Sequence, residues 1–239
     1  MKEKKMQQHY IVGDVHGEYK TLLALVALLP NNARLIFVGD LVNRGSQTKE
    51  VIEFVRQNAF YAVRGNHEEY FLKYGHLFLD MLANKEENSS LIWSHRMLPS
   101  TLRSYGLLAL ENGEIISDQE AIEVFKKDME WIESLSIAYE FGQLKGYSLP
   151  VVVTHAPVDR YWIFKESHPN YFAFFAMNNR GKPSKEAPIF NIHGHIPHEE
   201  VLFGMNYVNV DTGCGRGNDR ALSAYCVETK EVVTVPIVI

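Results

Sequence analysis

The chain has 239 residues, of which 46% are hydrophobic and 22% are charged, the composition of a folded globular protein. This length suits one domain with a substantial core, or one domain that carries a modest insertion. The formal net charge of −5 gives no indication of a surface that binds polyanions, which argues against nucleic acid as a partner.

The chain begins with a polar segment, Met1 to Gln8, that lacks the apolar core of a signal peptide. The longest apolar stretch, Leu22 to Leu29, is too short to cross a bilayer, so no membrane partner is expected. The two cysteines, Cys214 and Cys226, lack the paired spacing of metal ligands and are expected to be reduced thiols. Together these features predict a cytoplasmic protein.

Three short apolar runs in the first third of the chain each lead into a polar box. The runs are predicted as buried strands at 11–12, 35–38 and 60–63. The boxes that follow them are Gly13-Asp14-Val15-His16-Gly17, Gly39-Asp40-Leu41-Val42-Asn43-Arg44-Gly45 and Gly65-Asn66-His67-Glu68. Because carboxyl ends of neighbouring parallel strands converge, these side chains are expected to meet and to offer oxygen and nitrogen ligands to divalent cations.

Helices are predicted between these strands. Leu22 to Leu29 closes at Pro30, Lys49 to Asn58 separates the second and third boxes, and Glu68 to Met81 follows the third. Alternation of strands and helices over such short distances is typical of parallel βαβ units.

From residue 84 to 135 the chain becomes helical and polar, which indicates an insertion or cap within the domain. Ser117-Asp118-Gln119-Glu120 has the pattern of a capping box, with Glu120 placed to reach the amide of Ser117. Apolar residues then follow with helical periodicity up to Leu135.

The last part of the chain is predicted to be mainly strands, at 137–141, 149–154, 188–192, 207–210, 221–227 and 232–239. The aromatic-rich segment 160–188 is predicted as an irregular, substrate-facing loop. His155 directly follows one of these strands and His195 follows another, which adds two imidazoles to the set of candidate ligands.

Five ordered boxes from Gly13 to Gly213 make the chain similar to calcineurin-like metallophosphoesterases. Within that superfamily it resembles the phosphoprotein phosphatases, and among them the phage-lambda-type bacterial enzymes, through Ala62-Val63-Arg64-Gly65-Asn66-His67-Glu68. The resemblance implies an α/β (α+β) fold: a two-sheet β-sandwich flanked by helices, forming a single domain over 1–239 with the helical insertion at 84–135. It also implies hydrolysis of phosphate esters by two divalent metal ions.

The resemblance assigns one metal ion to Asp14, His16 and Asp40. It assigns the second to Asp40, Asn66, His155 and His195, with Asp40 bridging the two. Mixed oxygen and imidazole ligands suit Mn²⁺ first, with Fe or Zn²⁺ as alternatives. His193 matches no ligand position and is expected to support the site on the strand face that it shares with His195.

Four residues receive substrate-binding or catalytic roles from the resemblance. Arg44 and Arg180 would clamp phosphate oxygens, for which the planar guanidinium is well suited. His67 would be the general acid that protonates the leaving oxygen, and Asn66 would lie beside it in the substrate site.

Asn43 departs from the protein-phosphatase pattern, which has an Asp that pairs with the histidine matching His67. A neutral amide orients the ring without supplying charge, so His67 is predicted to be a weaker acid, with Asn43 tuning catalysis. The rate should then depend more strongly on the leaving group, and the pH–rate profile of Asn43→Asp tests this.

The sequence leaves the substrate open. A phosphoserine or phosphothreonine protein is favoured by the Arg64 lead-in of the third box. Symmetrical diadenosine tetraphosphate hydrolases share Asp211-Thr212-Gly213-Cys214 and often lack the Asp at position 43. Asn43 alone suggests a third class, a phosphoprotein-binding module with weakened turnover. Pro197 disfavours a nuclease, which would carry a further histidine there.

Overall fold

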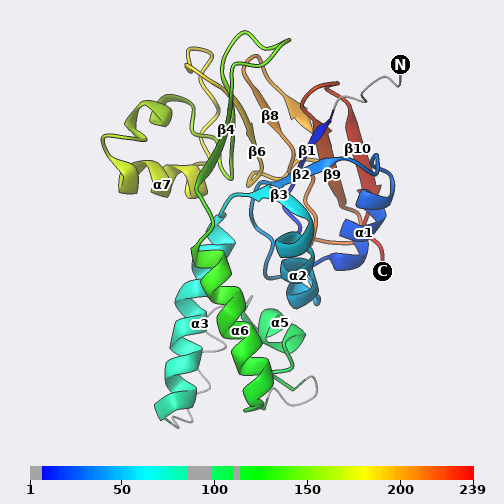
Figure 1. Ribbon diagram of the computed structural model, residues 1–239, viewed down its shortest axis with the longest axis vertical. Coiled ribbons are helices and arrows are strands. Elements are labelled where there is room, and N and C mark those ends of the chain that lie inside the picture. The colour runs from blue at the N-terminus through cyan, green and yellow to red at the C-terminus, as the bar shows by residue number, and fades with distance from the viewer. Residues whose placement is uncertain (1–6, 85–97, 110–113) are drawn as a thin grey trace.

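Two five-stranded sheets form the centre of the protein in the computed structural model (Figure 1). The structure describes residues 7–84, 98–109 and 114–239. Most of the predicted polar start and part of the predicted insertion, at 85–97 and 110–113, lie outside the described residues. Within the described chain no helix has the length and apolar character needed to cross a membrane.

The first sheet has the order β10-β9-β1-β2-β3. Its three parallel strands precede the polar boxes: β1 (His9–Val12), β2 (Arg34–Phe37) and β3 (Ala59–Ala62). β9 (Ala221–Cys226) pairs antiparallel with β1 and with β10 (Val232–Pro236). The predicted parallel units are thus confirmed, with two C-terminal strands added at one edge.

The second sheet has the order β4-β5-β6-β8-β7. Its strands are β4 (Ala138–Gly142), β5 (Val151–Thr154), β6 (Phe190–His193), β8 (Tyr207–Asn209) and β7 (Leu202–Phe203). β5, β6 and β8 are parallel, so the residues after β5 and β6 emerge at the same edge. The short edge strand β7 did not have a predicted counterpart.

Strand alternation explains how the sheets pack. Ile11 and Ile36 of the first sheet face Val153 and Ile192 of the second in one buried layer. Their sequence neighbours point the other way, into a layer covered by helices, so both faces of each central strand are buried. Strands of this kind are continuous apolar runs, as the sequence has them.

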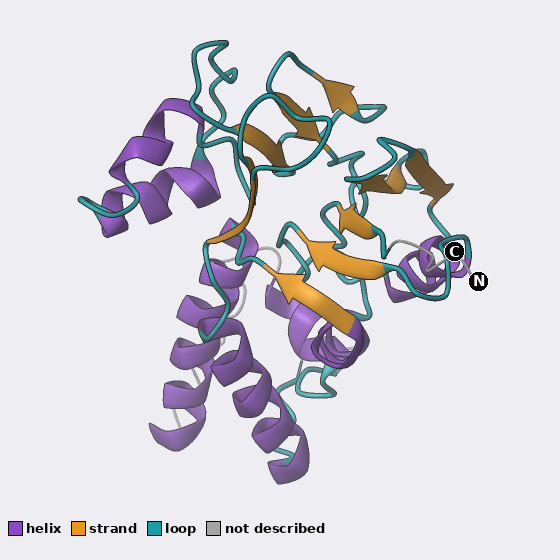
Figure 2. Cartoon of the chain, turned by 45° about the horizontal axis from the view of Figure 1, so that its top comes forward, coloured by secondary structure: helices purple, strands orange, loops and turns teal. Residues whose placement is uncertain are grey.

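Helices cover both outer faces (Figure 2). α1 (Tyr19–Ala27) and α2 (Thr48–Asn58) pack on the first sheet. The 3₁₀ helix η1 (Asp159–Phe164) and α7 (Pro169–Asn178) pack on the second. α3 (Asn66–Asn84) and α6 (Gln119–Glu133) run side by side away from the sheets, next to α5 (Leu98–Ser104), and Phe71 meets Phe125 at 5.2 Å between ring centres.

Two local predictions are wrong. The α6 N-cap is Asp118, whose carboxylate accepts the amide of Ala121, so the helix begins one residue later than a Ser117 capping box requires. Segment 160–188 is not irregular, because it contains most of η1 and all of α7. Pro169 occupies the first helical turn, where its missing amide hydrogen costs nothing, and Phe172 and Ala176 pack inward one turn apart.

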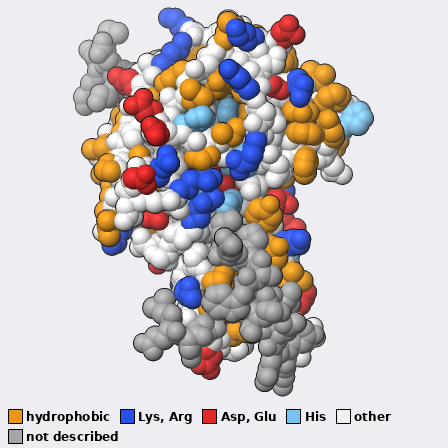
Figure 3. Space-filling view, turned by 180° about the vertical axis from the view of Figure 1, so that it is seen from behind, with side chains coloured by type: hydrophobic (Ala, Val, Ile, Leu, Met, Phe, Trp, Pro, Cys, Tyr) orange, Lys and Arg blue, Asp and Glu red, His pale blue; other side chains and the backbone are white. Residues whose placement is uncertain are grey.

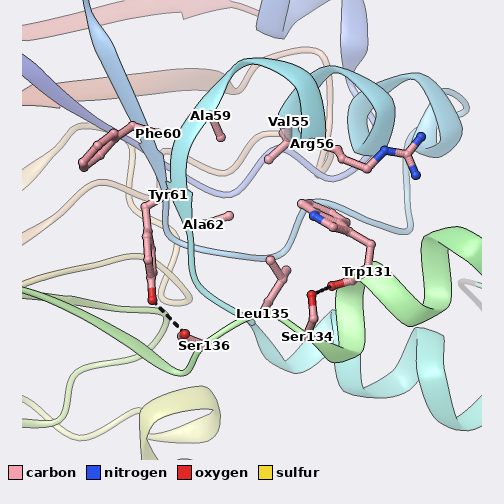
Figure 4. Close-up of a pocket in the computed structure, with 10 residues that line it drawn as sticks. All are labelled: Val55, Arg56, Ala59, Phe60, Tyr61, Ala62, Trp131, Ser134, Leu135 and Ser136. Atoms are coloured by element: carbon pink, nitrogen blue, oxygen red, sulfur yellow. Dashed lines mark hydrogen bonds between the residues drawn. The ribbon is translucent and has the colours of Figure 1, made fainter.

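A small cavity of about 230 Å³ lies where the helical region joins the first sheet (Figure 4). Its walls come from the end of α2, from β3 and from the end of α6. Tyr61 donates its hydroxyl to Ser136 across one side, at 2.7 Å. None of the predicted site residues lines it.

Candidate metal centre

Residues that follow β1, β2, β3, β5 and β6 meet at one edge of the sandwich. Asp40 lies at their centre. Its Oδ2 is 3.6 Å from Nε2 of His16 and 3.9 Å from Nε2 of His67, and its Oδ1 is 3.3 Å from Nε2 of His155. Ligand atoms of His16, Asp40 and His67 form one close group, and those of Asp40, His155 and His195 form another. A single carboxylate therefore joins two clusters of candidate metal ligands.

In the cluster around His155, nitrogen and oxygen atoms with free lone pairs face one another. Nδ1 of His155 donates to the carbonyl of Val38 at 2.9 Å, which leaves Nε2 of the neutral ring as an acceptor. That nitrogen lies 3.0 Å from Oδ1 of Asn66, 3.0 Å from Nδ1 of His195 and 3.3 Å from Asp40. A cation satisfies all of these atoms at once, so the residues fit a metal ion.

His16 has the same arrangement in the other cluster. Its Nδ1 donates to the carbonyl of Val42 at 3.0 Å, and its Nε2 is buried without a hydrogen-bond partner on the side of Asp40. A backbone carbonyl on the far nitrogen is the usual way in which a metal-binding imidazole is oriented.

Asp14 lies close enough to Asp40 for that carboxylate to raise the pKa of Asp14, but it is in neither of the two close groups. Its two carboxylate oxygens accept the backbone amide of His195 at 3.2 and 3.3 Å. It is fully buried beside Asp211, a carboxylate that the sequence assigned no role. The first close group contains His67 with His16 and Asp40, so two of the three predicted ligands of this ion are brought together there and Asp14 lies outside the group.

The carboxylates and imidazoles of the site are buried, and burial opposes the charged form of each. Burial, followed by neighbouring carboxylates, raises the pKa of Asp14 and Asp40 well above the usual range. Burial lowers the pKa of His16 and His155 well below theirs, followed by neighbouring histidines and, for His16, by Arg44 and Arg216. A divalent cation stabilises ionised carboxylates and neutral imidazoles together, and so offsets both penalties.

Strained backbone holds these side chains in place. Seven non-glycine residues of the described chain have a left-handed φ, and most of them lie in the site: His16, Asp40, Asn43, Arg44 and His195. Such conformations cost about 1–3 kcal/mol each and are retained where the surrounding structure enforces them. Gly65 permits the approach of Asp40, since a Cβ there would lie 2.4 Å from its Oδ1.

Glu68 supports the Asp40 turn from within α3. Its buried carboxylate accepts the amides of Asp40 at 2.7 Å, Leu41 at 2.8 Å and Gly65 at 2.8 Å. The sequence places Glu68 in the third box but does not indicate this role. Its only signal is an acidic residue in the first turn of a helix, a position that is normally exposed.

His67 is held by Asn43. The side-chain amide of Asn43 lies 3.2 Å from Nδ1 of His67 and 3.4 Å from the carbonyl of the same residue. A carbonyl only accepts, so the amide nitrogen faces both atoms and Nδ1 is the acceptor. The other end of Asn43 accepts the hydroxyl of Thr101, from α5, at 2.9 Å. The proton of His67 therefore lies on Nε2, the nitrogen that faces Asp40.

Arginines surround the site (Figure 3 shows Lys and Arg side chains beside histidines on one face). Arg44 is half-buried next to His16, and Arg180 is exposed next to His195. Arg216, which the sequence did not single out, lies close enough to lower the pKa of both histidines and of Arg44. Burial and Arg216 lower the pKa of Arg44, and the nearby carboxylates, of which Asp40 contributes most, offset this only in part.

His193 lies outside both close groups. β6 ends at His193, and His195 follows it with a φ of 70°, so the two rings do not share a strand face as predicted. The ring of His193 instead stacks near Tyr207 of β8, at 5.8 Å between ring centres.

The chain belongs to the calcineurin-like phosphoesterase family, whose model matches residues 10–215. It is 26% identical over 257 residues to a bis(5'-nucleosyl)-tetraphosphatase PrpE (asymmetrical) of Halalkalibacterium halodurans, covering 96% of this chain and 94% of that protein. A symmetrical bis(5'-nucleosyl)-tetraphosphatase of Coxiella burnetii is 29% identical over 74% of this chain and 55% of its own length. A serine/threonine phosphatase structure from Saccharomyces cerevisiae shares the fold, with a TM-score of 0.53, 14% identity, and coverage of 99% and 81%.

The family and the site agree on the class of enzyme. The protein is a metal-dependent phosphoric ester hydrolase of α/β architecture, and its site offers histidine and aspartate clusters for a dinuclear centre.

Proposed function

We propose that the protein hydrolyses the phosphoanhydride bond of nucleoside polyphosphates, with dinucleoside tetraphosphates as the substrate class. Relatives that match nearly the whole chain bear the name bis(5'-nucleosyl)-tetraphosphatase, which supports this choice. The single observation that carries it is the amide of Asn43 facing Nδ1 of His67.

That hydrogen bond favours a particular kind of leaving group. The imidazolium form of His67 would point its Nδ1 proton at the amide hydrogens of Asn43, so the neutral ring is preferred. A neutral imidazole is a poor proton donor, and an alcohol leaving group such as serine needs protonation. A phosphate leaving group is a much weaker base and departs without it.

Asp14, His16, Asp40, Asn66, His155 and His195 would hold two divalent cations, Mn²⁺ foremost and Fe or Zn²⁺ as alternatives. When bound, these ions supply an acidified water and neutralise charge on the phosphoryl group. Arg44 and Arg180 would bind the nonbridging oxygens of the phosphate under attack, and the Nε2 proton of His67 would hydrogen-bond the bridging oxygen. The attacking oxygen forms a new bond to phosphorus as the bridging bond breaks, and the electron pair leaves with the departing phosphate.

A phosphoserine or phosphothreonine protein is the second candidate, favoured by the sequence resemblance through Arg64. In the fold Arg64 pairs with Glu69 at 3.0 Å and donates to the carbonyl of Glu133 at 3.3 Å. Arg64 therefore joins the start of α3 to the end of α6, a structural role that is compatible with any substrate class. This removes one reason for preferring that substrate.

A substrate panel tests the proposal. Purified protein with Mn²⁺ is assayed against diadenosine tetraphosphate, a phosphoserine peptide and p-nitrophenyl phosphate. We expect kcat/KM for the tetraphosphate to exceed that for the peptide by about a hundredfold, the scale of an absent general acid. Preference for the peptide would establish the second candidate, and tight peptide binding without turnover of any compound would indicate a binding module.

A further inference from the structure

A second pocket lies beside the proposed phosphate site, on the outer face of the second sheet. Its volume is about 460 Å³, within the range of small-molecule sites. His193, Tyr207 and Asn209 form its floor at the ends of β6 and β8, and the segment from Arg180 to Pro183 forms its wall. Arg180 belongs to this pocket and acts electrostatically on His195 of the metal centre, so the two sites adjoin.

One buried polar atom in this pocket lacks a partner. Nδ1 of His193 lies 3.0 Å from the carbonyl of Gly194 and therefore donates to it, which leaves Nε2 as an acceptor. Nε2 is buried without a hydrogen-bond partner, and the residue is only 1% exposed. Unsatisfied buried acceptors are uncommon in native proteins, so a ligand donor is the natural complement. Asn209 does not compete, because its amide already binds Ile196 and Asp211.

The rest of the pocket is flat and apolar at one side and cationic at the other. Tyr207 stacks on His193 with ring planes 30° apart, and Leu202 of β7, which pairs with Asn209 and is 38% accessible, forms an apolar rim on the same face. Arg180 and Lys182 line the opposite side. Planar aromatic rings bind to surfaces of the first kind, and phosphates to groups of the second.

We infer that this pocket is a nucleobase subsite, which takes a purine with an exocyclic amino group while its phosphate chain passes Arg180 into the metal centre. The amino group would donate to Nε2 of His193, and the ring would pack between Tyr207 and the β7 rim. The inference rests on the proposed function, because it supplies the base end of that substrate. It adds that the protein recognises the base of the substrate as well as its phosphates.

Two variants test the subsite: His193→Leu removes the acceptor, and Leu202→Ala removes the apolar rim. Leu77→Ala is the matched control, because Leu77 is an exposed leucine, 37% accessible, outside the pocket. We expect each pocket variant to raise KM for diadenosine tetraphosphate about tenfold, the effect of one lost hydrogen bond or ring contact. KM for inorganic tripolyphosphate, which has no base, and kcat for both compounds should stay within about twofold.

Direct binding separates this inference from the reaction. Isothermal titration calorimetry with adenosine monophosphate should show binding to the wild-type chain that weakens about tenfold in both pocket variants and not in Leu77→Ala. If diadenosine tetraphosphate is not hydrolysed but this pattern holds, the proposed function fails and the subsite stands. If hydrolysis occurs with unchanged KM in Leu202→Ala and His193→Leu, the subsite is overturned. Thermal unfolding of each variant identifies a misfolded protein, and Leu202→Ala, at an exposed position, decides the matter if His193→Leu fails to fold.

Discussion

The side-chain amide of Asn43 lies 3.2 Å from Nδ1 of His67 and is fixed from behind by the hydroxyl of Thr101. An amide in this position orients the imidazole and opposes its protonation, whereas a carboxylate would favour the imidazolium. Because of this contact between Asn43 and His67, a change at Asn43 should affect substrates with different leaving groups to different extents.

Replacing Asn43 with Asp should convert His67 into a stronger proton donor. We expect kcat/KM for phosphoserine peptide to rise about tenfold or more, as general acid catalysis commonly contributes at least that much. Hydrolysis of p-nitrophenyl phosphate should change little, because its leaving group needs no proton. Steady-state kinetics on both substrates checks this, and an equal change for both would contradict it. Asn43→Ala, which removes the hydrogen bonds to His67 and Thr101 without adding a charge, is the control.

Asp40→Asn tests the shared carboxylate between the two clusters. Metal content measured by mass spectrometry should fall from about two ions per chain to about one or fewer, and kcat by about a thousandfold or more. In metal-free protein the same variant should be more stable, by about 1–3 kcal/mol, because the raised pKa of Asp40 shows that its buried charge opposes folding. Urea unfolding with chelator measures the second effect. Full activity with metal bound would defeat the ligand assignment.

Arg216 is expected to bind phosphates beyond the one under attack. It is exposed and acts on Arg44 and His195, so it extends the cationic rim of the site. Arg216→Ala should raise KM for diadenosine tetraphosphate about tenfold and that for p-nitrophenyl phosphate by about threefold or less. Arg160→Ala, at an exposed arginine against Tyr161, is the control and should leave both values unchanged. Equal losses on both substrates would place Arg216 at the reacting phosphate.

Acid should destabilise the fold partly through His193. Burial lowers its pKa from 6.5 to about 4, so below pH 6.5 the unfolded chain binds a proton that the native chain does not. The stability is thus complete above pH 6.5 and is lost as the pH falls towards 4, by about 2 kcal/mol at about pH 5. Urea unfolding of metal-free protein at about pH 7 and about pH 5 should show a loss that is about 2 kcal/mol larger in the wild type than in His193→Leu, since the other buried histidines contribute equally to both proteins. The exposed His168→Leu should behave as the wild type does.

The sequence was sufficient to predict which side chains lie close together at the ends of the strands. Gly-Asp, Gly-Asn and single-histidine boxes follow apolar runs, and parallel strands bring their ends together, so Asp40, Asn66 and His155 could be placed near one another in advance. The same reasoning missed what the tertiary contacts add. Thr101 reaches Asn43 across 58 positions of sequence, and no local pattern indicates that contact.

The helix boundaries and the second pocket could not be predicted from the sequence, and the reasons differ. Ser117 and Asp118 are both good N-caps, and only the fold decides which carboxylate or hydroxyl reaches an amide. The aromatic-rich segment 160–188 gave no clear helical pattern, whereas in the fold Pro169 occupies the first turn of α7, where proline is well tolerated. His193 could be judged a poor metal ligand, but its contact with Tyr207 depends on the pairing of β6 with β8.

Glu68 offers the sharpest test of how the fold holds the site. Its carboxylate accepts backbone amides on both sides of the Asp40 turn, including Asp40 at 2.7 Å and Gly65 at 2.8 Å. In Glu68→Gln one acceptor oxygen becomes an amide that faces other donors, which should cost about 2–4 kcal/mol of unfolding free energy and reduce kcat by about a hundredfold as Asp40 shifts.

Glu69→Gln is the matched control, since Glu69 is the next residue, its side chain is 44% exposed and its partner is Arg64. That change should cost about 1 kcal/mol or less, the usual value of an exposed ion pair, and leave kcat within about twofold. Denaturant unfolding and kinetics on both variants measure the difference. Equal effects at the two positions would mean that the Asp40 turn holds its strained conformation without Glu68.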